Sequence, residues 1–287
     1  MKSDPECLPC LLKQAYNTAV LATADKNQQR EIINRTARWI QEADLNQTPA
    51  AISTVVYRIV SEVTGIKDPY QKVKQNTNQM ALDLVPDLTE RMETATDPLD
   101  MALHLSVAGN IIDIGIGHDF DLNRDIQEII NTPFACNDTD VFRDDLQQGR
   151  KLLFLGDNSG EIVFDRLLLL YLLKKKLDIT YVVKSGPIIN DALMEDASTV
   201  GITKLVPVIE TGSDDIGILW DNSSKELKTA FKDSDIILAK GHGNFESCNE
   251  MPYNFYFLLK AKCNVVAKAL SVREGDIVFQ NKDNKIL

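Results

Sequence analysis

The sequence has few cysteines and no long apolar segment. Its five cysteines among 287 residues are an odd, sparse set, typical of reduced thiols rather than of a disulfide framework. The longest apolar run, residues 167–173, is too short to span a bilayer. The first ten residues are polar and lack the apolar stretch of a secretory signal. We therefore expect a soluble, cytoplasmic protein with no membrane partner.

Positive charge is also scarce. Forty-two acidic residues against 31 basic ones give a formal net charge of −11. A surface of this sign repels a phosphate backbone, so no nucleic-acid partner is expected. It also repels free anionic substrates. Any phosphate site must therefore supply its own positive charge, from a metal, a lysine or a helix N-terminus.

The pattern of apolar residues changes between residues 133 and 150. Before this point apolar residues recur at helical spacing, as at Ile52, Val56, Ile59 and Val60, which predicts six or seven helices and few or no strands. From Lys151 onward the pattern alternates between strand and helix. The expected strands are 151–156, 179–184, 204–209, 235–240 and 264–269, with an antiparallel edge strand at 276–280. The expected helices are 160–176, 189–199, 223–231 and 251–260.

Alternating strands and helices indicate an α/β fold with a mostly parallel sheet. We predict a helical N-terminal subdomain, residues 1–145, and an α/β domain, residues 146–287. Ligands in such sheets bind outside the carboxyl ends of the strands. The segments that follow the first four strands there should share one edge, and they are 156–161, 185–191, 210–215 and 240–246.

Polar residues in these segments predict a metal site. Asp157, Asn158 and Asp191 offer hard oxygen ligands of the kind that Mg²⁺ and Mn²⁺ prefer. Ser159 begins a helix whose N-terminus favours an anion. The alternative is that these residues are helix caps. Lys240 leaves its strand into a glycine-flanked loop, where a compact positive charge suits phosphate.

Two further features are less specific. Cys7-x-x-Cys10 fits a redox pair, half of a zinc site or two thiols on a helix surface, because there is no second such motif in the chain. His242 lies among glycines and is interpreted as an exposed loop residue, not as a metal ligand.

Six separated motifs resemble the damage-control phosphatase family, also called domain of unknown function 89. They are ECLPCLLKQA (6–15), DPYQKVKQNTNQMA (68–81), AGNIIDIG (108–115), GDNSGEIVFD (156–165), GPIINDAL with EDA (186–197) and KGHGNFES (240–247). The N-terminal CxxC resembles the shorter archaeal and bacterial branch. The resemblance implies a helical subdomain beside a Rossmann-like α/β/α sandwich. It also implies a phosphatase that uses Mg²⁺, Mn²⁺, Co²⁺ or Ni²⁺ on sugar phosphates or damaged phosphometabolites.

The resemblance also assigns roles to residues. The family's metal ligands match Asp157, Asn158 and Asp191, and its phosphate-contacting lysine matches Lys240. The AGNIID motif implies that Asn110 and Asp113 face the cleft, with Glu161, Asn190 and Asn244 as neighbours. On this basis a metal-oriented water attacks phosphorus, Asp157 or Asp191 assists as base, and an aspartyl-phosphate intermediate stays open.

Two other functions stay open on the sequence. A Rossmann-like sheet also suits a methyltransferase that uses S-adenosylmethionine, although Asp-Asn-Ser-Gly replaces a glycine-rich nucleotide loop after the first strand. A non-enzymatic metal- or redox-responsive module could be built on Cys7 and Cys10. The sequence names neither the natural substrate nor the oligomeric state.

Overall fold

A computed structural model describes residues 1–112 and 122–283. The helices are α1 (Cys7–Ala22), α2 (Lys26–Glu42), α3 (Pro49–Thr64), α4 (Gln71–Thr94), α5 (Pro98–Ile112), α6 (Leu122–Ile130), α7 (Thr139–Gln148), α8 (Glu161–Leu173), α9 (Met194–Thr199), α10 (Lys225–Asp233), α11 (Gly241–Cys248) and α12 (Asn264–Leu270). The strands are β1 (Cys136–Asn137), β2 (Lys151–Leu155), β3 (Asp178–Val183), β4 (Val208–Glu210), β5 (Ile236–Lys240), β6 (Phe255–Lys260) and β7 (Ile277–Asn281).

The strands form one sheet in the order β1-β7-β6-β5-β2-β3-β4. Every neighbouring pair is parallel except β6 with β7, so the expected antiparallel strand near the C-terminus is confirmed. The fold is therefore mixed α/β with a mostly parallel seven-stranded sheet, as predicted.

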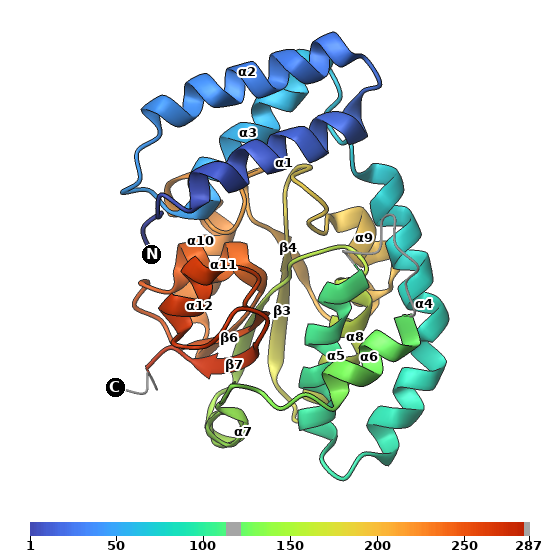
Figure 1. Cartoon of the computed structure of the whole chain (residues 1–287). Helices are drawn as coiled ribbons and strands as arrows, with labels where there is room; N and C mark the ends of the chain where they lie inside the picture. The colour runs from blue at the N-terminus through green and yellow to red at the C-terminus, as the bar shows by residue number, and fades with distance from the viewer. Residues whose placement is uncertain (113–121, 284–287) are drawn as a thin grey trace.

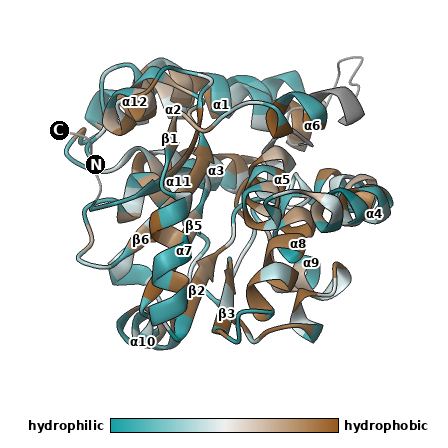
Figure 2. Cartoon of the chain, turned by 90° about the horizontal axis from the view of Figure 1, so that it is seen from below, coloured by the Kyte–Doolittle hydropathy of each residue, from teal (hydrophilic) through white to brown (hydrophobic). Residues whose placement is uncertain are grey.

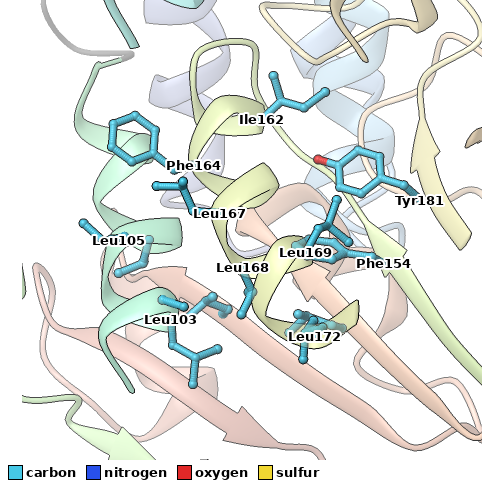
Figure 3. Close-up of a cluster of buried hydrophobic side chains, with 14 of the residues drawn as sticks. Leu103, Leu105, Phe154, Ile162, Phe164, Leu167, Leu168, Leu169, Leu172 and Tyr181 are labelled. Carbon is cyan, nitrogen blue, oxygen red and sulfur yellow. The ribbon is translucent and has the colours of Figure 1, made fainter. Parts of the chain in front are cut away.

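Helices cover both faces of the sheet. Leu152 and Phe154 of β2 point into an apolar cluster with α4, α5 and α8, whereas Leu153 and Leu155 point into a second cluster with α10, α11 and α12. This alternation follows from the period of two along a strand. Figure 3 shows the first cluster, where α8 leucines and Phe164 meet Leu103 and Leu105 of α5. Figure 2 shows apolar residues gathered on the central strands and α8.

Helices α1, α2 and α3 form a separate apolar cluster, and they stack at one end of the sheet (Figure 1). Helices α4 to α6, by contrast, share their cluster with the sheet and α8. The N-terminal helices therefore fall into two groups. Helices α1 to α3 share an apolar cluster of their own, and helices α4 to α6 pack against the sheet. A division of the chain at residue 145 stays a prediction.

The predicted order of elements is wrong between residues 251 and 270. The segment expected to be helix contains β6, and the segment expected to be strand is α12. Pro252 disfavours a helix across this segment, and Phe255, Tyr256 and Phe257 are aromatic residues that favour a buried strand. In α12, residues Val266, Ala267 and Leu270 are buried at helical spacing.

Within residues 1–112 and 122–283, no helix is both long and apolar enough to cross a membrane.

Candidate active site

The strand order reverses at β2. Strands β3 and β4 lie to one side of it, and β5, β6 and β7 lie to the other. After β2 the chain adds β3 and β4 on one side, and it then returns to add β5 on the other side of β2. The loops that follow β2 and β5 therefore lead in opposite directions and leave a crevice between them. Ligands bind in this crevice in open α/β sheets. Asp157 and Asn158 lie in the loop that directly follows β2. The topology therefore places the predicted metal ligands at the expected position.

A cavity of about 440 Å³ opens at this edge. Three of the four predicted segments contribute to it, with Asp157 and Asn158 after β2, Asn190 and Asp191 after β3, and His242 and Gly243 after β5. No residue of the segment 210–215 lines this cavity, but Ile216, which directly follows that segment, does. Helices α1 and α3 line the opposite wall with Cys7, Cys10, Gln14, Pro49, Ala50 and Ser53. The helical layer therefore closes the crevice over the carboxyl ends of the strands.

Backbone pairing fixes the loop after β2 against the loop after β3. Asn158 and Asp191 form an isolated antiparallel bridge. The Ser159 amide donates to the Asn190 carbonyl oxygen at 2.9 Å, and the Ala192 amide donates to the Asp157 carbonyl oxygen at 2.8 Å. The three predicted ligands therefore belong to one small, hydrogen-bonded unit, although 33 residues separate Asn158 from Asp191 in the chain.

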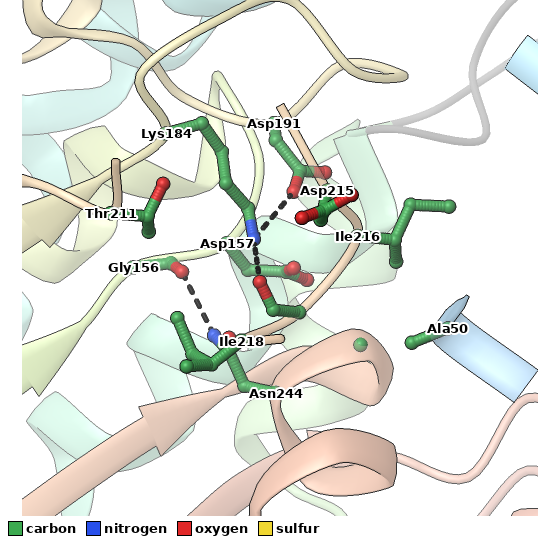
Figure 4. A network of polar contacts seen from close by, with 12 residues as sticks. Ala50, Gly156, Asp157, Lys184, Asp191, Thr211, Asp215, Ile216, Ile218 and Asn244 are labelled. Carbon is green, nitrogen blue, oxygen red and sulfur yellow. Dashed lines mark hydrogen bonds and ion pairs between the residues drawn. The ribbon is translucent and has the colours of Figure 1, made fainter. Parts of the chain in front are cut away.

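Side-chain contacts hold these groups further. The Asn158 amide nitrogen donates to Asp157 Oδ2 at 2.9 Å and to Glu161 Oε2 at 3.2 Å. The Lys184 ammonium lies 3.6 Å from Asp191 Oδ2 and donates to the Gly217 carbonyl oxygen. Figure 4 shows Lys184 reaching toward Asp191 beside Asp157. Lys184 ends the segment predicted as the second strand and was missed, because it lacks the directly following glycine that drew attention to Lys240 at the end of the fourth strand.

The electrostatics of Asp157 fit a bound cation. Burial raises its pKa well above the ordinary value, and the neighbouring charges of Glu161 and Asp191 raise it further. Within residues 1–112 and 122–283, no group of three or more His, Cys, Asp and Glu side chains has metal-binding spacing. A centre here would thus consist of two carboxylates and the Asn158 amide, a hard oxygen set that suits Mg²⁺ or Mn²⁺ with several retained waters.

Lys240 is in the protein interior and does not line the cavity. Its ammonium donates to Glu161 Oε1 at 2.6 Å, to Asp165 Oδ1 at 2.7 Å and to the Ser106 carbonyl oxygen at 3.0 Å. Burial opposes its charge, but the Asp165 and Glu161 carboxylates outweigh burial and raise the pKa of the Lys240 ammonium. These three bonds use all the donors of the ammonium. A phosphate contact by Lys240 stays a prediction.

Residues 3–278 match the damage-control phosphatase ARMT1-like domain. The chain therefore belongs to this family. A damage-control phosphatase of Archaeoglobus fulgidus is 35% identical over 97% of this chain and 98% of its own length. An uncharacterised protein of Methanocaldococcus jannaschii is 35% identical over 97% and 95%. The crystal structure of a DUF89 family protein from Pyrococcus horikoshii superposes with a TM-score of 0.90, at 29% identity, over 98% of this chain and 99% of that one.

In this damage-control phosphatase family member, the other predicted site residues are located as follows. Asn190 lines the cavity. Glu161 and Asn244 are buried and support the loops, and the Asn244 amide bonds the Gly156 and Lys240 carbonyl oxygens at 3.0 and 2.9 Å (Figure 4). Ser159 is buried, and within the described residues its hydroxyl makes no hydrogen bond. Substrate contacts by these residues stay predictions.

The AGNIID motif falls partly outside the described residues. Asp113 lies outside them, and so does the side chain of Asn110 in α5. The preceding Gly109 explains one part of the motif. A Cβ at this position would lie 2.8 Å from Glu161 Cα, so glycine is needed for α5 to approach the start of α8.

Cys7 and Cys10 line the same cavity as the predicted metal ligands, which the sequence alone did not show. Cys263, the residue before α12, lines it too, so three thiols from distant parts of the chain lie around one cavity. Burial raises the pKa of the Cys7 and Cys263 thiols. Their position ties the CxxC motif to the cavity, while a redox or metal-binding role for it stays a prediction.

The segment after β6 also reaches the cavity, with Lys262, Cys263 and Asn264. His242 is not an exposed loop residue, because its side chain is 20% exposed and it lies in the first turn of α11. Its Nε2 lies 2.8 Å from the Lys260 carbonyl oxygen and from the Lys262 backbone nitrogen. Sequence reasoning missed Lys262, because the strand before it was predicted as a helix.

Proposed function

We propose that this chain is a divalent-metal-dependent phosphatase that hydrolyses small phosphorylated metabolites such as sugar phosphates or damaged phosphometabolites. The observation that carries the proposal is the unit formed by Asp157, Asn158 and Asp191 at the point where the strand order reverses, facing a cavity of about 440 Å³. A cavity of this size suits a small molecule. Curated relatives in Archaeoglobus fulgidus and Pyrococcus horikoshii carry the name damage-control phosphatase, which supports the same reaction here.

Different residues of the chain have different roles in the proposed hydrolysis. A divalent ion such as Mg²⁺, Mn²⁺, Co²⁺ or Ni²⁺, held by Asp157, Asn158 and Asp191, would neutralise charge on the phosphoryl oxygens and acidify a bound water. Asp157 or Asp191 accepts the proton of the attacking water. The water oxygen bonds to phosphorus as the ester P–O bond breaks, and the leaving alkoxide takes up a proton from solvent to give the alcohol, while the carboxyl group later returns its proton to solvent. Lys184, which does not line the cavity, lies 3.6 Å from Asp191 Oδ2 and holds Asp191 in position.

The buried carboxylates next to the site are neutralised by a buried lysine. Glu161 and Asp165 lie one turn apart on the buried face of α8, and both bind Lys240. The Asp165 carboxylate also accepts bonds from Ser106 Oγ at 2.6 Å and from the Tyr181 hydroxyl at 2.7 Å. These contacts fix the start of α8, and with it the loop that carries Asp157 and Asn158. Positioning of this kind is most of what an enzyme contributes to phosphoryl transfer.

The test is hydrolysis of p-nitrophenyl phosphate after treatment with EDTA, with Mg²⁺, Mn²⁺, Co²⁺ and Ni²⁺ added back singly. Asp157→Ala should lose at least about 100-fold in rate, since it removes a ligand that neutralises the reacting group. Asp178→Ala is the matched control, because Asp178 is an exposed carboxylate at the opposite end of β3.

Restored hydrolysis in the wild type and in Asp178→Ala, but not in Asp157→Ala, is the expected result. Hydrolysis that survives EDTA and the Asp157 substitution alike would refute the metal site. Absence of hydrolysis with all four metals would count against a phosphatase. Calorimetric titration with S-adenosylmethionine would then test the methyltransferase alternative.

A further inference from the structure

The leaving group of the proposed hydrolysis needs a proton. Asp157 or Asp191 takes a proton from the attacking water, whereas the ester oxygen must gain one, because an alkoxide is a strong base and leaves slowly without it. Solvent is the simplest source of this proton. A cavity side chain that gives it up in the transition state is more effective, provided that it is protonated near the operating pH and lies apart from the metal ligands.

Glu246 lies on the cavity face of α11. It lines the same cavity as Asp157, and its side chain is 12% exposed. His242 and Gly243 line this wall too, four and three residues before Glu246, so all three belong to one face of the helix. The helix begins at Gly241, which packs against the Asp157 carboxylate. A rise of about 1.5 Å per residue puts Glu246 about 7–8 Å further along the axis, which leaves room for a metal ion and a phosphoryl group.

The carboxyl of Glu246 is mostly protonated at neutral pH. Burial raises its pKa to about 8, although the Met1 ammonium and the Ala50 backbone amide both lower it. Burial and the charge of Lys262 lower the pKa of the neighbouring His242 imidazole to about 4. Near pH 7 the carboxyl and the imidazole are therefore both neutral, and they do not form an ion pair although Glu246 Oε1 lies 3.9 Å from His242 Nδ1.

Among the residues that the structure describes, no group accepts the proton of this carboxyl. The side chain accepts a bond from the Ala50 backbone amide, one of the free amides at the start of α3, and makes no other hydrogen bond within residues 1–112 and 122–283. His242 Nδ1, at 3.9 Å, is beyond hydrogen-bond distance. Buried polar groups usually have a partner, so a protonated carboxyl of this kind beside a cavity is placed to donate to a ligand.

We propose that Glu246 is the general acid of the reaction and donates its proton to the ester oxygen of the bound substrate. The inference rests on the proposed phosphatase function and names the proton donor for the same site. The water oxygen bonds to phosphorus, the ester P–O bond breaks with its electron pair on the ester oxygen, and the Glu246 proton converts this oxygen to an alcohol. The remaining carboxylate takes a proton from solvent, which balances the proton that Asp157 or Asp191 returns.

The test compares two esters of similar shape whose leaving groups differ in basicity. p-Nitrophenolate is weakly basic and leaves without a proton, whereas phenolate has a conjugate acid of pKa about 10 and gains from one. Glu246→Gln keeps the size of the side chain but has no acidic proton. Its kcat/KM for phenyl phosphate should fall by about 100-fold or more, a typical contribution of a general acid, while that for p-nitrophenyl phosphate stays within about fivefold of the wild type.

Glu250→Gln is the matched control, because Glu250 is a 77% exposed carboxyl two residues beyond the end of α11. It should hydrolyse both esters at the wild-type rate. Asp157→Ala should lose both esters alike, so the ratio of the two kcat/KM values distinguishes proton donation from metal binding. Urea denaturation at pH 7 checks that Glu246→Gln is as stable as the wild type, as expected when an amide replaces a protonated carboxyl.

An unchanged ratio of the two kcat/KM values in Glu246→Gln, with both esters retained or both lost, would overturn the role of Glu246 and leave the phosphatase standing. Wild-type hydrolysis of p-nitrophenyl phosphate without hydrolysis of phenyl phosphate would also overturn it, because a general acid assists the more basic leaving group. Hydrolysis of neither ester by the wild type, with any of the four metals, would refute the phosphatase and the role of Glu246 with it.

Discussion

Gly241 packs directly against the carboxylate of Asp157, and a Cβ at this position would lie 1.9 Å from Asp157 Oδ2. The contact joins the first residue after β5 to the first predicted metal ligand after β2. Strands β2 and β5 are the neighbours between which the strand order reverses. The shape of the candidate site therefore depends on the absence of a side chain at residue 241.

Gly241→Ala should displace the Asp157 carboxylate and reduce metal-dependent hydrolysis by at least about 100-fold, because a misplaced reacting group costs this much in rate. The control is Gly65→Ala. Gly65 has φ of 72° and Gly241 has φ of 74°, but a Cβ at Gly65 would meet nothing within 4 Å. Gly65→Ala should cost about 1 kcal/mol in the free energy of unfolding, from its left-handed backbone, and leave hydrolysis intact. Equal activity of the two variants would show that the contact does not matter.

Lys240→Met should destabilise the fold by about 3–5 kcal/mol, because it leaves the buried Glu161 and Asp165 carboxylates without their cation. Chemical denaturation measures this loss. Lys204→Met removes an exposed lysine and serves as the control. A variant with unchanged stability and no hydrolysis would instead favour the phosphate contact that the family resemblance implies.

The proximity of the three candidate metal ligands could be predicted from sequence because the signal for their position is local. Asp157 and Asn158 follow an apolar strand, Asp191 follows another, and parallel strands end at one edge of a sheet. The role of Lys240 was harder to predict. The pair Glu161 and Asp165, one turn apart in a helix of leucines, indicates a buried cation but does not say which lysine supplies it.

Lys262 and the thiols were missed for different reasons. The apolar run at 255–260 fits a buried helix or strand by periodicity alone, and the wrong choice moved Lys262 away from the edge where ligands bind. Cys7 and Cys10 lie about 250 residues from Cys263 in the chain, and no local pattern brings such segments together. Packing of α1 over the sheet edge decides their position.

The stability of the protein should depend on pH through Glu246. Burial raises the pKa of the Glu246 carboxyl to about 8. The unfolded chain loses this proton near its ordinary pKa of about 4.5, whereas the folded chain keeps it to about 8. The folded state binds more protons in this interval, so the free energy of unfolding falls as pH rises from about 4.5 to about 8.

Glu246→Gln removes this dependence. Its stability should equal that of the wild type near pH 4 and exceed it above pH 8 by on the order of 5 kcal/mol. Urea denaturation across this pH range measures the difference. Glu250→Gln, at a nearby side chain that is 77% exposed, should show no such pH-dependent gain. A constant difference between Glu246→Gln and the wild type at every pH would contradict the prediction.

The position of Cys10 makes the cavity accessible to thiol reagents. Cys10 is exposed and lines the cavity wall opposite the loops that carry Asp157 and Asp191, so a bulky group attached to its Sγ would occupy space that a substrate needs. N-ethylmaleimide should therefore lower wild-type hydrolysis by about tenfold or more, since a blocked cavity excludes the substrate from the reacting geometry. Cys10→Ser should hydrolyse p-nitrophenyl phosphate within about threefold of the wild type, because a hydroxyl of similar size keeps the cavity open. The same variant should resist the reagent.

Cys248→Ser is the control. The Cys248 thiol is fully buried and its pKa is raised to about 12, so it should not react with N-ethylmaleimide, and Cys248→Ser should be inactivated like the wild type. Inactivation of Cys10→Ser at the wild-type rate would place the sensitive thiol elsewhere. A loss of hydrolysis in Cys10→Ser before any reagent is added would instead make the CxxC motif part of the reaction itself.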